Sequence, residues 1–123
     1  MKPIDTKTHG YLDYIVGIFL IASPSLFDLN PHATESIIFY SLGGAAILYS
    51  LLTNYELGVL KLIPMKLHLT IDAVSGIFLA TSPWLLGFAE RVYAPHLALG
   101  IFEIVAAIVT NPKPVRQITE NPI

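Results

Sequence analysis

The sequence contains no cysteine, so neither a disulfide bond nor a thiolate metal site can form within this chain. Charge is also scarce, because Asp, Glu, Lys and Arg make up only 13% of the residues, about half the share of a soluble domain. A soluble domain of 123 residues would need more charge to cover its surface. The net charge of -2 and the lack of a basic cluster give no sign of a nucleic-acid partner.

Long stretches without charge take up most of the chain. The four stretches are 14–27, 36–54, 73–89 and 92–110, the last interrupted by His96 and Glu103. As helices, the second and third would be about 25–29 Å long at ~1.5 Å per residue, close to the ~30 Å hydrocarbon thickness of a bilayer. We therefore predict an all-α membrane protein with four transmembrane helices, surrounded by lipid.

An internal repeat runs through the chain. Segments beginning at His9 and His68 align without gaps (68 − 9 = 59), and each carries a histidine, an aspartate, a glycine and a Ser-Pro pair. The matched pairs are His9/His68, Asp13/Asp72, Gly17/Gly76, Ser23/Ser82 and Pro24/Pro83. Apolar helices resemble one another easily, but a shared polar frame of this kind indicates duplication.

The second helix of each repeat matches at a smaller offset (100 − 43 = 57), which pairs Gly43 with Gly100. The sequence thus predicts one membrane domain over residues 1–123, built from two helical hairpins. The first repeat spans 9–54 and the second 68–111, and a tail over 112–123 follows. We expect that tail to be extended, since it contains three prolines.

The motif Ser82-Pro83-Trp84, followed by Leu-Leu-Gly-Phe, resembles the SPW repeat family of small bacterial membrane proteins. A degenerate copy, Ser23-Pro24-Ser25, stands at the matching place in the first repeat. The resemblance extends from about residue 9 to residue 111 and implies a two-helix repeat with the motif on its first helix. It brings no established biochemical activity. Ser25 stands where the motif has tryptophan, so a role that needs the indole ring can be filled only by Trp84.

The basic residues predict an orientation. Those before the first helix, in the central link and after the fourth helix are Lys2, Lys7, Lys61, Lys66, Lys113 and Arg116. Only Arg91 lies in the two remaining loops. By the positive-inside rule, both termini and the central link face the cytoplasm. The family resemblance implies that the membrane is a bacterial inner membrane. The hairpins are then parallel repeats, related by a pseudo-two-fold axis along the membrane normal.

The residues most able to carry chemistry are His9, Asp13, His68 and Asp72. Within each repeat the histidine and aspartate are four residues apart and share a helix face. If the first and third helices meet, the two pairs face each other and could hold a divalent ion such as zinc or iron, or pass protons. The alternative is a purely structural hydrogen-bonded tie between those helices.

Glu103 is a second candidate, because it lies near the middle of an apolar stretch. An ionised, unpaired carboxylate there would cost on the order of 3 kcal/mol. We expect it to face the interior, to be protonated, or to bond to Tyr40, Tyr49, Ser41 or Ser50. The first repeat has Ala46 at this place, so the feature is not symmetric.

The other motif residues are interpreted as structural. Pro24 and Pro83 should end or kink their helices near the outer end, with the preceding serine capping a following turn. Trp84 should lie at the outer interface. Small residues at Gly17, Gly43, Gly76 and Gly100 should allow close helix contact, within the chain or in a homo-oligomer. His32 and His96 are expected at the surface.

Three functions remain open at this level. The first is a membrane scaffold or partner-binding bundle, which the sequence favours because it contains no recognisable enzyme motif. The second is a protein that handles a metal ion or protons through the four histidine and aspartate residues and Glu103. The third is a membrane enzyme acting on a lipid-soluble substrate. The sequence specifies no cofactor apart from the divalent metal of the second hypothesis.

Overall fold

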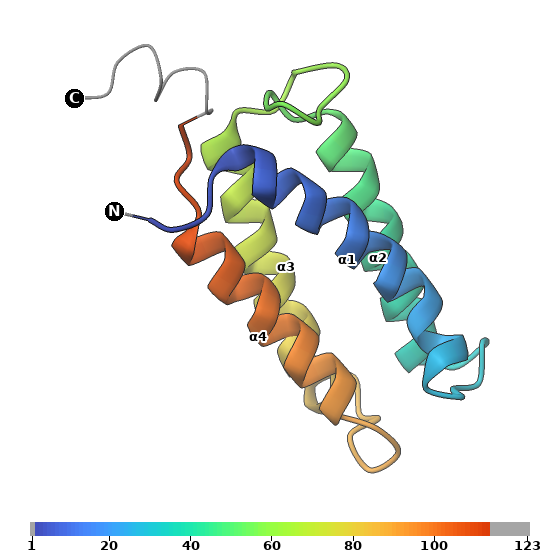
Figure 1. Cartoon of the computed structure of the whole chain (residues 1–123). Coiled ribbons are helices and arrows are strands. Elements are labelled where there is room, and N and C mark those ends of the chain that lie inside the picture. The colour runs from blue at the N-terminus through green and yellow to red at the C-terminus, as the bar shows by residue number, and fades with distance from the viewer. Residues whose placement is uncertain (1, 114–123) are drawn as a thin grey trace.

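The computed structural model describes residues 2–113 and consists of four α-helices. They are α1 (Thr6–Leu26), α2 (Thr34–Leu51), α3 (Met65–Leu85) and α4 (Ala94–Val109). Figure 1 shows two hairpins, α1 with α2 and α3 with α4, with the N-terminal segment and the link between α2 and α3 at one end of the molecule. The loops inside the hairpins lie at the other end. The predicted all-α fold with four helices is therefore confirmed.

Measured by length and mean hydropathy together, none of these helices within residues 2–113 qualifies as a membrane-crossing span. The predicted tail over 112–123 lies almost wholly outside the described residues, which end at Lys113.

The first helix begins and ends through local backbone chemistry. The Asp5 side chain caps α1 by accepting a hydrogen bond of 2.7 Å from the Thr8 amide. That amide holds the pKa of Asp5 below its ordinary value. Pro24 lies in the last turn of α1, and just beyond the helix Asp28 adopts a left-handed backbone with φ of 55°.

The third helix ends in the same way. Pro83 lies in its last turn, and Gly87, two residues beyond the helix, has φ of 77°. Glycine favours this left-handed conformation because it lacks a Cβ atom. Proline thus ends the odd-numbered helices near the loop end of the bundle, as the sequence predicted.

The predicted capping role of the serines is wrong. Ser23 and Ser82 are fully buried inside α1 and α3, and no new turn begins at either residue. The Ser23 hydroxyl donates to the Phe19 carbonyl at 2.7 Å, and the Ser82 hydroxyl donates to the Leu79 carbonyl at 2.7 Å. Each serine bonds backward along its own helix because the proline that follows does not stop the helix at once.

Glycine allows the two helices of each hairpin to approach closely. A Cβ atom built on Gly43 would lie 2.7 Å from the carbonyl oxygen of Gly17, so α1 and α2 are in backbone contact there. The same holds for α3 and α4, where a Cβ atom on Gly100 would lie 2.5 Å from the carbonyl oxygen of Gly76. Each hairpin is tightly packed as a result, while contacts between the hairpins are fewer and involve chiefly α2 and α3.

A small apolar core joins the hairpins toward their loop end. Leu20, Phe39 and Leu79 are fully buried and form one cluster. His96 is also fully buried, with its ring stacked on Phe39 at a centroid distance of 4.0 Å. The expectation that His96 lies at the surface was therefore wrong. Phe39 and His96 occupy matching positions of the two repeats (96 − 39 = 57), so these matching side chains meet each other.

Replacing Gly43 with alanine should lower the free energy of unfolding by about 1–3 kcal/mol, because the added methyl group clashes with backbone and with Ile21. Gly44 is the matched control, since a Cβ atom there meets nothing within 4 Å. Gly44→Ala should stabilise the helix by up to about 1 kcal/mol. Thermal unfolding of both variants in detergent, followed by circular dichroism, measures the difference. Equal effects at the two positions would contradict the close approach of α1 and α2.

Candidate metal centre

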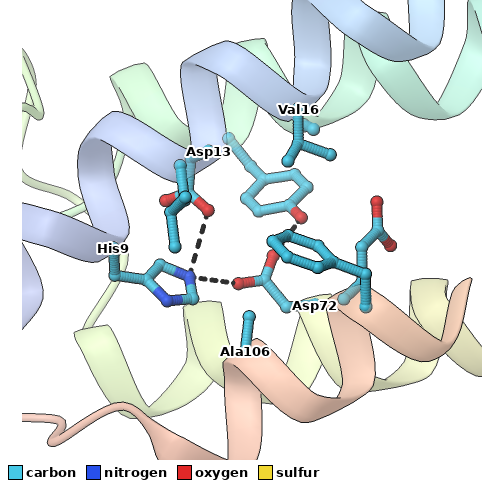
Figure 2. Close-up of a pocket in the computed structure, with 10 residues that line it drawn as sticks. His9, Asp13, Val16, Asp72 and Ala106 are labelled. Atoms are coloured by element: carbon cyan, nitrogen blue, oxygen red, sulfur yellow. Dashed lines mark hydrogen bonds and ion pairs between the residues drawn. The ribbon is translucent and has the colours of Figure 1, made fainter. Parts of the chain in front are cut away.

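Four ionisable side chains from both hairpins meet inside the bundle, near the end that holds the N-terminal segment. His9 and Asp13 come from α1, and His68 and Asp72 come from α3. One nitrogen or oxygen atom of each lies within 4.8 Å of those of the other three. Figure 2 shows His9 and Asp13 directed toward Asp72 across the space between the helices. The side chains that the repeat predicts to face each other therefore do so.

The imidazoles and carboxylates contact one another across the repeats as well as within them. His9 Nε2 lies 2.8 Å from Asp72 Oδ2 and 3.0 Å from Asp13 Oδ1. His68 Nε2 lies 3.0 Å from Asp13 Oδ2 and 3.2 Å from Asp72 Oδ2. Each Nε2 atom thus faces both carboxylates, one from its own helix and one from the other hairpin.

The opposite nitrogen of each ring bonds to a threonine. His9 Nδ1 lies 2.7 Å from the Thr110 hydroxyl, and His68 Nδ1 lies 2.7 Å from the Thr53 hydroxyl. Each hydroxyl donates its single proton to a backbone carbonyl one turn earlier, at 2.6 Å and 2.7 Å respectively. The threonine oxygen must then accept, so Nδ1 carries the proton in both rings. This leaves Nε2 as the ring nitrogen that can bind an ion.

Short backbone pairings position the two threonines. Ile4, just before α1, pairs with Thr110, and Ile63, just before α3, pairs with Thr53. The end of α4 is thereby fixed to the segment leading into α1, and the end of α2 to the segment leading into α3. Because each threonine lies beside the start of an odd-numbered helix, it reaches the histidine in the first turn of α1 or α3.

Two tyrosines hold the carboxylates. The Tyr49 hydroxyl donates to Asp72 Oδ1, and the Tyr55 hydroxyl donates to Asp13 Oδ2 at 2.7 Å. These tyrosines do not occupy matching positions. The position that corresponds to Tyr49 in the second repeat is Ala106 (106 − 49 = 57), so the site loses its internal symmetry at this point.

The donor set suits a borderline divalent ion such as zinc, which binds imidazole nitrogen and carboxylate oxygen in a tetrahedron. With metal–ligand distances of about 2.0–2.1 Å, neighbouring ligand atoms lie about 3.3 Å apart. The four nitrogen–oxygen distances here run from 2.8 to 3.2 Å. A tetrahedral site would also bring the remaining donor pairs, which lie within 4.8 Å of one another, to about the same spacing. Metal-binding histidines usually donate their other N–H group, as both rings do here.

A cavity of about 20 Å³ lies beside the cluster, enough for about one water molecule. Glu103 lines it together with Tyr49, Asp72 and Ala106, and one oxygen of Glu103, Oε2, is buried without a hydrogen-bond partner. Glu103 thus faces the interior, as expected. The expected hydrogen bond from Tyr49 to Glu103 is not formed, because that hydroxyl donates to Asp72.

The Ser-Pro-Trp segment lies at the other end of the bundle from this cluster. Trp84 is 55% exposed and lies near Tyr93, with a ring-centroid distance of 5.8 Å. At the same end, the Arg91 guanidinium donates to both Glu35 oxygens at 3.0 Å and 2.9 Å. That carboxylate keeps the pKa of Arg91 above its ordinary value. These contacts hold the loop end together, apart from the candidate metal centre.

Sequence reasoning did not assign the threonines and tyrosines to this site. A signal for the threonines was present, since Thr53 and Thr110 recur at the same offset as the matched glycines. No comparable signal marked Tyr49 and Tyr55, because neither has a tyrosine at the matching position of the second repeat. Their role follows only from the way α2 and the link fold over α1 and α3.

The family model described as the SPW repeat domain matches residues 7–110, a range that includes all but the first residue of α1 and all of α2, α3 and α4. No curated protein and no solved structure matches this chain. The match extends over both histidine–aspartate pairs and both threonines that contact them.

Replacing Glu103 with methionine should raise the free energy of unfolding by about 1–3 kcal/mol, because it removes a buried oxygen that has no hydrogen-bond partner while keeping a similar volume. Glu103→Gln serves as the control, since its amide remains polar and should bring less of this gain. Thermal unfolding in detergent measures both variants. A methionine variant less stable than the parent protein would mean that the carboxyl group has a favourable partner in the folded state.

Proposed function

Since the chain belongs to the SPW repeat family, we propose that it is an integral membrane protein whose residues His9, Asp13, His68 and Asp72 bind one divalent metal ion. The observation that carries the metal site is the convergence of two Nε2 atoms and two carboxylates from both hairpins within 4.8 Å. The proposed orientation places both termini, and therefore the metal centre, toward the cytoplasmic face of a bacterial inner membrane.

The outward faces of the helices support the placement in lipid. On every helix, large apolar side chains point away from the bundle, and many are more than half exposed. Examples are Ile15 at 62%, Leu48 at 61%, Val74 at 62% and Ile108 at 61%. Water would leave each of these unburied, at roughly 1.5–3 kcal/mol apiece, whereas lipid removes that penalty. The acids within the helices point inward, as shown by Asp72 and by the buried Oε2 of Glu103.

Charge balance supports a divalent ion rather than a monovalent one. Two aspartates contribute a charge of about −2, which one divalent cation and two neutral imidazoles offset completely. Two imidazolium groups would offset it equally well in the absence of metal. The interior can therefore hold either two protons or one divalent ion without a net charge, which matters in surroundings of low dielectric constant. Binding of the ion would release protons.

The contacts also favour a second role, a tie between the hairpins. Packing between the hairpins is sparse compared with packing inside them, and His9 forms a direct hydrogen bond to Asp72 across that junction. In this reading the protein is a scaffold, and the four side chains only hold its two halves together. The two roles make different predictions about bound metal.

We expect the protein to remain in the pellet when cell membranes are washed with alkaline carbonate, and to be released by detergent. Carbonate removes proteins held at the surface by charge, whereas proteins embedded through apolar side chains stay behind. An immunoblot of both fractions is the measurement, with one known peripheral and one known integral protein as controls. Release by carbonate alone would contradict the membrane placement and leave the metal site to be judged separately.

Protein purified without chelator or metal-affinity resin should contain close to one divalent ion per chain, measured by elemental mass spectrometry. His9→Ala with His68→Ala should lose it, because both Nε2 ligands disappear. His32→Ala is the control, since His32 is an exposed histidine in a loop. Asp13→Asn with Asp72→Asn tests the same site while preserving side-chain size, which guards against a variant that fails to fold.

A bound ion should also raise the melting temperature of the parent protein when it is added back after chelation. At one hundred times the dissociation constant, the gain is about 2.7 kcal/mol. No ion in the purified protein and no shift on addition of zinc, iron(II) or manganese(II) would exclude the metal site. The tie would then remain, and it predicts only a loss of stability in the histidine double variant.

A further inference from the structure

A groove on the lipid-facing side of the second hairpin has features that the metal centre does not use. It has a volume of about 420 Å³, within the range of small-molecule sites. Its lining is mainly apolar, from residues of α3 and α4 such as Ala73, Val74 and Ile108. Two lysines, Lys2 and Lys66, also line it, and both lie near the end of the molecule that holds the N-terminal segment.

At the matching place of the first hairpin, the central link covers the surface. Leu57 of the central link packs on Gly10, where an added Cβ atom would lie 2.8 Å from the Leu57 side chain. The Tyr14 hydroxyl donates to the Leu57 carbonyl at 2.7 Å and closes the surface. The second repeat has Ala73 in place of Tyr14, and the loss of the tyrosine ring leaves room for the groove, with Leu69 in its lining at the place of Gly10.

Both lysines are exposed, and neither makes an ion pair within the part of the chain that the structure describes. A pair of cations above an apolar groove matches a molecule with an anionic head and hydrocarbon chains. In the proposed orientation the groove opens into the cytoplasmic leaflet, which is the anionic one.

We propose that this groove binds one anionic phospholipid, with its phosphate between Lys2 and Lys66 and an acyl chain along Ala73, Val74 and Ile108. The proposal rests on the membrane placement proposed above, but it does not depend on the metal centre. A zwitterionic lipid fits the apolar part equally well, yet it carries no net charge for the two lysines to attract. The occupant is therefore selected by its head group.

The test is lipid binding to the full-length protein in detergent micelles, measured by native mass spectrometry during titration with phosphatidylglycerol or phosphatidylcholine. We expect one phosphatidylglycerol to bind more tightly than phosphatidylcholine. Each lysine near an anionic head group contributes on the order of five-fold in affinity, so Lys2→Gln with Lys66→Gln should weaken phosphatidylglycerol binding about 25-fold. Binding of phosphatidylcholine should stay unchanged.

The matched control is Lys7→Gln with Lys61→Gln. These lysines occupy the corresponding positions of the other repeat (66 − 7 = 59), so the variant changes the net charge equally away from the groove. Ala73→Leu is a third variant, which narrows the groove without altering charge and should weaken binding of both lipids. Parallel losses in the two lysine variants would show general electrostatic attraction and overturn the site.

Equal affinity of the parent protein for the two lipids would also overturn the proposed lipid site. A dimer that excludes lipid would overturn it too, because a second copy of the chain would then occupy the groove. The titration takes place in micelles, so its result does not depend on how the protein behaves in carbonate. A protein that resists carbonate but shows no preference between the lipids would retain its membrane placement and lose this site. Carbonate release combined with selective binding would point to a lipid-binding protein outside the bilayer core.

Discussion

The arrangement of the two hairpins depends on burying two imidazoles and two carboxylates at one point. Any of these groups would be costly alone in the interior, since removing one partner of a buried pair typically destabilises a protein by about 3–5 kcal/mol. Together they stabilise one another, because each Nε2 atom faces a carboxylate from its own helix and one from the other hairpin. Sliding α1 along α3 would separate both contacts that cross between the hairpins, His9–Asp72 and His68–Asp13.

The need to balance these four buried groups also explains the hydrogen bonds around them. The imidazoles need a fixed orientation, which Thr53 and Thr110 provide, and the carboxylates need their remaining lone pairs satisfied, which Tyr49 and Tyr55 do. The backbone pairings at the ends of α2 and α4 hold the threonines in turn. The polar end of the bundle is therefore one connected network, whereas the loop end relies on aromatic stacking and a single Glu35–Arg91 pair.

The sequence predicts the parts of this structure that the duplication repeats. The offset between His9 and His68 predicted two hairpins with facing polar pairs, and the matched glycines marked where helices touch. Contacts of residues that differ between the two repeats were not predicted. His96 looks like a surface residue, because nothing in its neighbourhood reveals that it stacks on Phe39. Tyr55 lies in a link, where sequence alone does not show which helix the side chain will reach.

The positions at which the two repeats differ also give the two hairpins different surfaces and cavities. Ala106 stands where the first repeat has Tyr49, and Glu103 stands where it has Ala46, so a small cavity with an unpaired carboxyl oxygen opens beside only one face of the cluster. Ala73 stands where the first repeat has Tyr14, and the groove of the second hairpin opens beside it. At both places the smaller side chain leaves space, while the histidine and aspartate pairs are the same in the two halves.

The hydrogen bonds of the two imidazoles help to distinguish a metal site from a purely structural tie between the hairpins. A tie needs each histidine to make one direct hydrogen bond across the hairpins, and His9 makes such a bond to Asp72. His68 Nε2 lies 3.0 Å and 3.2 Å from two carboxylate oxygens but forms a hydrogen bond with neither. A buried ring nitrogen without a partner is unfavourable by about 1–3 kcal/mol in a tie. A divalent ion held by the four groups would give His68 Nε2 the partner that it lacks.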